Sequence, residues 1–271
     1  MKFAFGRIIV QILGSDELVG FMRNEWNNYL LTDSGYTPDC ILCIEPLPEI
    51  GSEIRADGWK EEEIYGKATA VYSKTGKPII GICVLPEQKE TTVYVNTGNG
   101  NSFVRMGVQF GILMAQHSQC IGLHGVTLVC GEEIIILSAP SGTGKSTLGG
   151  LLEKYCDAVV INGDFAMLTV TEDGVIFEPT PLCGTSKRSL NHRLPVHRVV
   201  FLGQAKENLW RELDGREALT QFLNNVFVPT WDQNSQQAVQ ENILKCIRKL
   251  KVNAYDFVPT REAAEMFMKQ L

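Results

Sequence analysis

The stretch Ala139-Pro-Ser-Gly-Thr-Gly-Lys-Ser-Thr147 is the part of the sequence from which the fold is best predicted. It meets the pattern G-x-x-x-x-G-K-[ST], with alanine at a first position that needs only a small side chain. The run before it, Glu132-Glu-Ile-Ile-Ile-Leu-Ser138, has the composition of a strand, and the spacing predicts a helix over 145–155. A strand, a glycine-containing loop and a helix in this order are typical of a loop that binds phosphate groups.

The residue types of this loop suit an anionic ligand. Gly142 and Gly144 allow the backbone to bend so that several N–H groups point at one anion, and the helix adds its positive end there. The ammonium group of Lys145 can bridge the β- and γ-phosphates, and the hydroxyl of Ser146 can ligate Mg²⁺. The predicted nucleotide-binding residues are Ser141, Gly142, Thr143, Gly144, Lys145, Ser146 and Thr147.

His124 lies in the first of two apolar runs, 123–130 and 132–138, which a Gly-Glu pair separates. These runs predict a β-hairpin, in which the start of the first strand lies beside the end of the second. We therefore expect His124 next to the phosphate loop, where an imidazole can contact a transferring phosphate. The alternative is a half-buried strand histidine with a structural role.

Asp164 follows Val159-Val-Ile-Asn-Gly163, a pattern that predicts a buried strand. A carboxylate at the end of such a strand lies at the sheet edge where ligands bind in open α/β folds. It can hold Mg²⁺, together with Ser146, or accept the proton of an attacking hydroxyl. Asn-Gly-Asp is also a good turn sequence, so a structural turn residue is the alternative.

Composition excludes several function classes. The chain has 271 residues and a net charge of −6, so it lacks the basic footprint of nucleic-acid binding. No apolar run approaches the roughly 18 residues that span a bilayer. The eight cysteines are unpatterned, and Cys40-x-x-Cys43 has no second pair that would complete a zinc site. These features predict a soluble, cytoplasmic protein.

Two regions differ in their patterning. Residues 1–97 predict a β-rich N-terminal part, and residues 98–271 predict a P-loop catalytic domain of α/β class. The predicted strands of the first region are 3–13, 40–44, 68–72, 79–85 and 91–95, with one helix near 15–30. In the second region we predict a helix over 103–118, a hairpin at 166–177, an ordered loop over 178–195, a strand over 196–202 and C-terminal helices near 212–226, 234–250 and 260–270.

The segments around His124, the phosphate loop and Asp164 together resemble the HPr kinase/phosphorylase family. That family has His-Gly on the preceding strand, then the P-loop, then Asp-Asp after the next strand, and its catalytic domain is related to that of phosphoenolpyruvate carboxykinases. The resemblance covers about residues 103–270. The chain looks like the shorter HPr-kinase-like proteins associated with modified-peptide gene clusters, including lasso-peptide serine kinases.

The resemblance implies an ATP- and Mg²⁺-dependent kinase that phosphorylates a serine hydroxyl on a small protein or a precursor peptide. Carried over by position, Ser141–Thr147 bind the nucleotide phosphates and Ser146 ligates Mg²⁺. His124 contacts the phosphoryl region, and Asp164 is the base. Related kinases form hexamers, but this sequence shows no interface signature, so whether the protein is a homo-oligomer stays open.

The chain departs from the family at one point. Where the family has two carboxylates, this sequence has Gly163-Asp164. Either Asp164 performs both metal binding and proton transfer, or another acid such as Glu178 or Asp157 contributes. The departure weighs against the reverse reaction, phosphorolysis of phosphoserine. It also supports a second hypothesis, a nucleotide-binding regulatory protein without turnover.

Two further points stay open at the level of the sequence. A kinase for a small molecule such as free serine remains an alternative, because no motif identifies the acceptor. We expect the loop that begins at Cys183, with Lys187 and Arg188, to lie near the acceptor; a solvated basic loop is its alternative.

Overall fold

The computed structural model describes residues 1–6, 8–33, 35–49, 58–74, 77–85, 89–95, 120–228 and 233–271. The chain divides into two compact units, one formed by Met1–Gln116 with Pro229–Gln233 and the other by His117–Val228 with Asn234–Leu271. The predicted boundary at 97/98 and the predicted helix over 103–118 lie outside the described residues. None of the helices in the described ranges is long and apolar enough to cross a membrane.

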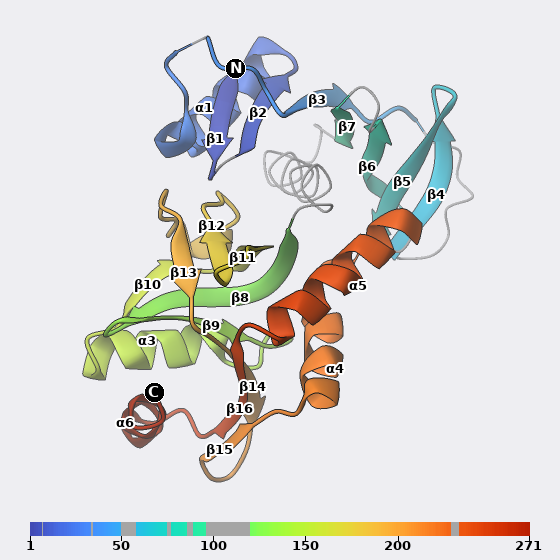
Figure 1. The fold of residues 1–271 in the computed structure, drawn as a ribbon. Helices are drawn as coiled ribbons and strands as arrows, with labels where there is room; N and C mark the ends of the chain where they lie inside the picture. Colours follow the sequence, from blue (N-terminus) through green and yellow to red (C-terminus); the bar gives the residue numbers. More distant parts are fainter. Residues whose placement is uncertain are drawn as a thin grey trace. The chain divides into compact units, whose positions relative to one another are not determined.

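The first unit contains a seven-stranded sheet in the order β1-β2-β3-β7-β6-β5-β4 (Figure 1). Its strands are β1 (Lys2–Phe5), β2 (Ile8–Leu13), β3 (Cys40–Pro46), β4 (Gly58–Ile64), β5 (Lys67–Lys74), β6 (Lys77–Leu85) and β7 (Glu90–Val95), and its described helices are α1 (Asp16–Glu25) and the short 3₁₀ helix Asn27–Tyr29. The predicted strand 3–13 is two strands, because Gly6 adopts φ +64° between them. The sequence also missed β4, whose run of charged residues resembles a loop.

The two cysteines of the C-x-x-C pair lie on β3. Side chains three positions apart on a strand point to opposite faces, so Cys40 and Cys43 cannot share one metal ion. Burial raises the pKa of the Cys40 thiol to about 12 and also raises that of Cys43. Both thiols are therefore protonated and structural at neutral pH.

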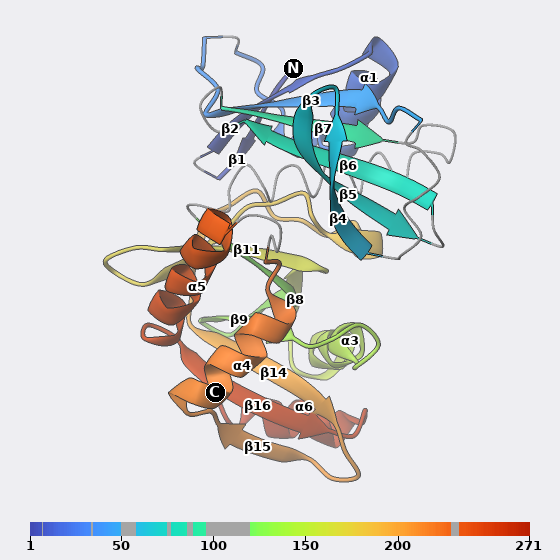
Figure 2. The same ribbon diagram turned by 90° about the vertical axis from the view of Figure 1, so that its right-hand side faces the viewer.

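The second unit contains a nine-stranded sheet in the order β13-β12-β11-β8-β9-β14-β16-β15, with β10 also paired to β8 (Figures 1 and 2). Its strands are β8 (Ile121–Cys130), β9 (Glu133–Ser138), β10 (Val159–Asn162), β11 (Phe165–Val170), β12 (Val175–Glu178), β13 (Leu194–Val196), β14 (Arg198–Gln204), β15 (Leu209–Glu212) and β16 (Lys251–Phe257). Its helices are α3 (Lys145–Tyr155), α4 (Gly215–Asn225), α5 (Gln233–Ile247) and α6 (Arg261–Met268).

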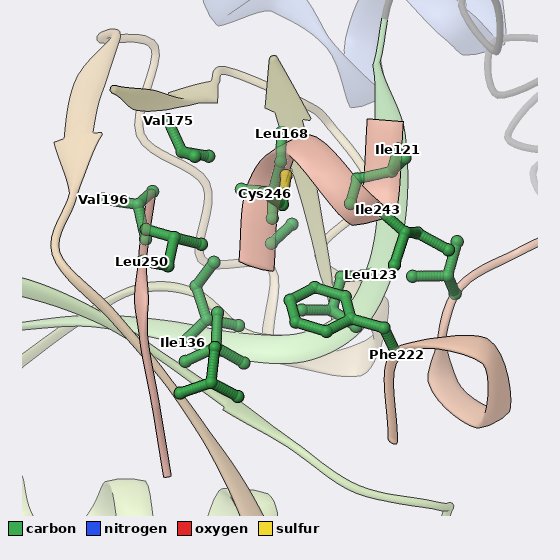
Figure 3. Packing of buried hydrophobic residues seen from close by; sticks show 14 of the residues in the cluster. Ile121, Leu123, Ile136, Leu168, Val175, Val196, Phe222, Ile243, Cys246 and Leu250 are labelled. Carbon is green, nitrogen blue, oxygen red and sulfur yellow. The ribbon is translucent and has the colours of Figure 1, made fainter. Parts of the chain in front are cut away.

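Helices cover both faces of this sheet, so the side chains of the central strand β9 are buried on both sides. Its side chains alternate, so that Ile134 and Ile136 join one buried cluster while Ile135 and Leu137 join another. The first cluster packs under α4 and α5, where Phe222 and other apolar side chains meet (Figure 3). The second packs under α3 and α6. Burial on both faces explains why β9 has a continuous apolar sequence.

Several local predictions are confirmed. The helix predicted over 145–155 coincides with α3, and the predicted hairpin at 166–177 is β11 and β12. The helices predicted near 212–226, 234–250 and 260–270 are confirmed as α4, α5 and α6, but the strands β15 and β16 of this region were not predicted. The sequence of β16 mixes polar with apolar residues. Its strand conformation is stabilised by parallel pairing with β14 and antiparallel pairing with β15.

Candidate phosphate-binding site

The phosphate loop joins the end of β9 to the start of α3. Gly142 and Gly144 adopt φ +82° and +115°, the left-handed region in which a side chain would be strained. Gly144 is the N-cap of α3 and gives no side-chain hydrogen bond to the first turn. The N-cap therefore leaves the first-turn N–H groups of α3 able to bind an anion.

Lys145 is held inside the loop. The side chain is largely buried, and its Nζ donates to the carbonyl oxygens of Ala139 at 2.7 Å and Pro140 at 3.2 Å. Burial lowers the pKa of Lys145, while the negative charge of Asp164 acts in the opposite direction. The ammonium group is thus held at the base of the loop, within electrostatic reach of Asp164.

His124 and Asp164 meet beside this loop. β8 pairs antiparallel with β9, with Gly125 opposite Ser138, so His124 lies at the loop edge of the sheet as predicted. β11 pairs with the other edge of β8, with Phe165 opposite His124. The His124 Nε2 is 3.3 Å from the Asp164 Oδ1, and both side chains are partly exposed. The structure therefore places an imidazole and a carboxylate together at the loop.

A fixed turn positions Asp164. Asn162 is fully buried, and its Oδ1 accepts hydrogen bonds from the backbone N–H groups of Asp164 and Phe165, both at 3.1 Å. The Asp164 carbonyl oxygen accepts from the Gly125 N–H at 2.8 Å. Asp164 can therefore be both a turn residue and a site residue, because the Asn-Gly-Asp turn holds its carboxylate at the site.

The loop that follows Cys183 covers this turn. A Cβ added at Gly163 would lie 2.0 Å from the Ser186 Oγ and 2.5 Å from the Ser186 Cβ. A Cβ at Gly184 would lie 2.9 Å from Asp164 side-chain atoms, and Gly184 has φ +57°. The loop therefore packs against both Gly163 and Asp164, and it fills the space that a second carboxylate at position 163 would need.

The other two acids that the sequence offered lie elsewhere. The Glu178 carboxylate is nearly buried and accepts two hydrogen bonds from Arg193, at 2.9 and 3.0 Å. Asp157 comes after the C-terminal end of α3, the end opposite Lys145. Among the three candidates, Asp164 is the one that lies at the loop.

The crowding at Gly163 makes a testable prediction. We expect Gly163→Asp to lower the free energy of unfolding by about 1–3 kcal/mol, because the new side chain overlaps Ser186. Adding Ser186→Gly removes both overlapping atoms and should restore most of that loss. Urea unfolding of the two single variants and the double variant measures the coupling. Purely additive losses would show that Ser186 is not what excludes a side chain at 163.

Two site residues were missed by sequence reasoning. Gln204 donates from its Nε2 to the carbonyl oxygens of Gly142 and Thr143, at 3.3 and 3.4 Å. The ring of Phe257 lies 3.1 Å from the position of a Cβ at Gly144. Gln204 ends β14, which pairs in parallel with β9, and Phe257 ends β16, which pairs in parallel with β14. The available signal was the rule that ligands bind at carboxyl ends of strands, but β16 was not predicted as a strand.

The remaining predicted residues suit a metal–nucleotide complex. Ser146 is the second residue of α3, and it lines one pocket together with Gly163, the neighbour of Asp164. One hydroxyl and one carboxylate, completed by substrate phosphates and water, form the kind of oxygen set that Mg²⁺ takes. The donor set at Ser146 and Asp164 therefore fits Mg²⁺.

Comparisons with known proteins find likenesses among solved structures. No protein-family model and no curated relative matches the chain. The solved structures that it resembles include the HPr(Ser) kinase/phosphatase from Coxiella burnetii, with a TM-score of 0.33 and 11% sequence identity. That likeness covers 55% of this chain and 86% of the other.

Proposed function

We propose that the protein is a phosphotransferase that moves the γ-phosphoryl group of ATP to a hydroxyl group, and that the acceptor is a serine of a small protein or peptide. The observation that supports this proposal most strongly is the contact between His124 and Asp164 beside the phosphate loop and its buried Lys145. A phosphate loop alone binds nucleotide, whereas an adjacent carboxylate can also accept a proton from an acceptor.

In the proposed reaction the acceptor oxygen forms a bond to the γ-phosphorus while the bond from that phosphorus to the β,γ-bridging oxygen breaks. The hydroxyl proton passes to the carboxylate of Asp164, and ADP leaves. Backbone N–H groups of 142–147 and the Lys145 ammonium stabilise the charge on the phosphoryl oxygens. Phosphoryl transfer requires little else of the protein than this positioning and charge stabilisation.

His124 supports the carboxylate in this scheme. Its Nε2 contacts the Asp164 Oδ1. Its backbone carbonyl oxygen accepts a hydrogen bond from the Ser138 hydroxyl at 2.8 Å. The imidazole therefore orients Asp164 and can donate to a phosphoryl oxygen. Mg²⁺, when bound by Ser146 and Asp164, would neutralise charge on the β- and γ-phosphates.

A second candidate function is nucleotide binding without turnover, as in a regulatory protein. It is favoured by the packing of Ser186 against Gly163, which leaves one carboxylate at the site. The two candidates share the phosphate loop and differ only in whether Asp164 transfers a proton.

A two-part experiment separates them. The first part measures the thermal shift of the protein with ATP and Mg²⁺, and both candidates require a rise in Tm. The second part incubates the protein with ATP, Mg²⁺ and serine-containing peptides or free serine, and uses mass spectrometry to detect the gain of one phosphate. A rise in Tm without phosphate on any acceptor would favour the regulatory protein, and no rise in Tm would contradict both.

A further inference from the structure

One pocket of this unit extends away from the phosphate loop. It has a volume of about 320 Å³ and is lined by Val126, Ser146, Gly150, Glu153, Val160, Gly163, Ser186 and Arg188. Ser146, Gly150 and Glu153 fall on one face of α3, since they are spaced by four and three positions. The pocket therefore runs along α3, with Ser146 and Gly163 at one end and Glu153 with Arg188 at the other.

Gly150 has no evident role in the fold. Glycine in a helix interior costs stability relative to alanine, so its presence usually has a packing reason. Gly149 has such a reason, because a Cβ there would already contact Val160 and Val126 at 3.4 and 3.6 Å. A Cβ at Gly150 would meet nothing within 4 Å. The glycine at 150 thus keeps space open in the pocket rather than allowing close packing.

Arg188 is positioned at the far end of the pocket. Its guanidinium is paired with the Glu153 carboxylate, and its backbone N–H donates to the Ser186 Oγ at 3.1 Å. Glu153 is itself fixed, because it accepts the Val160 N–H at 3.1 Å. The Arg188 side chain is about half exposed, and a guanidinium carries five N–H donors in a planar fork. Glu153 therefore holds Arg188 in place while other donors of the fork remain able to bind an anion.

The length of the pocket bears on what it can hold. Glu153 lies two turns of α3 after Ser146, a distance of about 10 Å at 1.5 Å per residue. In its pair with Glu153, the Arg188 guanidinium therefore lies beyond contact with a phosphate bound at Ser146, and the separation corresponds to about three residues of extended peptide. An anion at Arg188 would consequently belong to the acceptor and not to the nucleotide.

We infer that this pocket receives the part of a peptide acceptor that flanks the phosphorylated hydroxyl, and that Arg188 binds an acidic side chain about three residues from that hydroxyl. The inference rests on the proposed function and makes it more specific. The acceptor hydroxyl lies at the Ser146 end of the pocket, beside Asp164. The apolar side chains of Val126 and Val160 contact the peptide residues between that hydroxyl and the acidic side chain. Glu153 is a positioning residue that acts through Arg188.

The test uses short synthetic peptides that each contain one serine. The residue three positions before or three positions after that serine is aspartate, alanine or lysine. The wild-type protein is expected to phosphorylate an aspartate peptide with the lowest KM. Gly150→Leu fills the pocket at a position without steric conflict, so its Tm should equal or exceed that of the wild type, while its KM for that peptide rises at least about tenfold. Its affinity for ATP and Mg²⁺ should be unchanged.

Arg188→Gln should raise the KM for the aspartate peptide by about tenfold or more and leave the KM for the alanine peptide unchanged, because one charge-assisted contact is lost. Lys154→Gln is the matched control, since it removes a positive charge from exposed surface of α3 outside the pocket. It should behave as the wild type with every peptide.

The outcomes distinguish the inference from the proposed function. Equal KM values for the aspartate and alanine peptides, or wild-type KM values in Gly150→Leu and Arg188→Gln, would overturn the assignment of the pocket and leave the kinase proposal standing. Wild-type protein that binds ATP but phosphorylates no peptide would contradict both.

Discussion

Replacing Asp164 with asparagine is expected to lower the rate of phosphoryl transfer by about 10²–10⁴-fold, the range that one general base contributes. The affinity for ATP with Mg²⁺ should change little by comparison, because Lys145 and the loop N–H groups remain. The turn should survive as well, since Asn162 binds the backbone of residue 164 and not its side chain. Single-turnover kinetics with calorimetric nucleotide binding measures both quantities.

Asp173→Asn is the control for this variant. Asp173 is an exposed acid between β11 and β12, at the opposite end of β11 from Asp164, so its replacement removes the same charge without touching the site. Full transfer rate in Asp164→Asn would show that this carboxylate is not the proton acceptor. A loss of ATP affinity as large as the loss of rate would assign Asp164 to metal binding alone.

Lys145→Met is expected to weaken ATP binding by about 10- to 100-fold, the range for a lost charge-assisted hydrogen bond, and to lower the transfer rate further. At the same concentration of ATP and Mg²⁺, the variant should show a smaller rise in Tm than the wild type. Its affinity for ATP is measured by calorimetry. Wild-type affinity in Lys145→Met would contradict the assignment of this loop as the phosphate site.

The same variant should remain stable without ligand. Burial lowers the pKa of Lys145, which means that the fold disfavours its charged form. The native state therefore releases this proton at a lower pH than the unfolded state does, and the charge costs stability below the native pKa. An apolar side chain of similar length removes that cost and also the two hydrogen bonds to Ala139 and Pro140, so a change within about 1 kcal/mol is expected from urea unfolding. In the wild type, the contribution of Lys145 to stability should rise as the pH increases from its lowered pKa towards 10.5.

The phosphate loop was predictable because its chemistry lies in consecutive residues. Gly142, Gly144 and Lys145 act through the backbone of one loop and one helix, so their spacing in the sequence is their spacing in the site. The position of His124 was predictable for a related reason. In the hairpin of β8 and β9, the start of β8, where His124 lies, is next to the end of β9, where the loop begins. The direct contact between His124 and Asp164 was not predicted, because it also requires β11 to pair with β8.

Long-range packing decided the parts that the sequence could not supply. Gln204 and Phe257 reach the loop only because β14 pairs with β9 and β16 pairs with β14 in the sheet. The polar residues of β16 predict no strand on their own, and its pairing on both sides overrides that local pattern.

The sequence by itself determined a strand, a glycine-containing loop with Lys145 and a helix in this order, and a single acid, Asp164, after the next strand. Periodicity and glycine placement act over a few residues and can be recognised without the fold. Only the tertiary structure decided that Ser186 fills the space beside Gly163 and that Arg188 is held by Glu153 across a pocket on α3. These contacts join residues far apart in the chain, and the hydrophobic cores on both faces of the sheet bring them together.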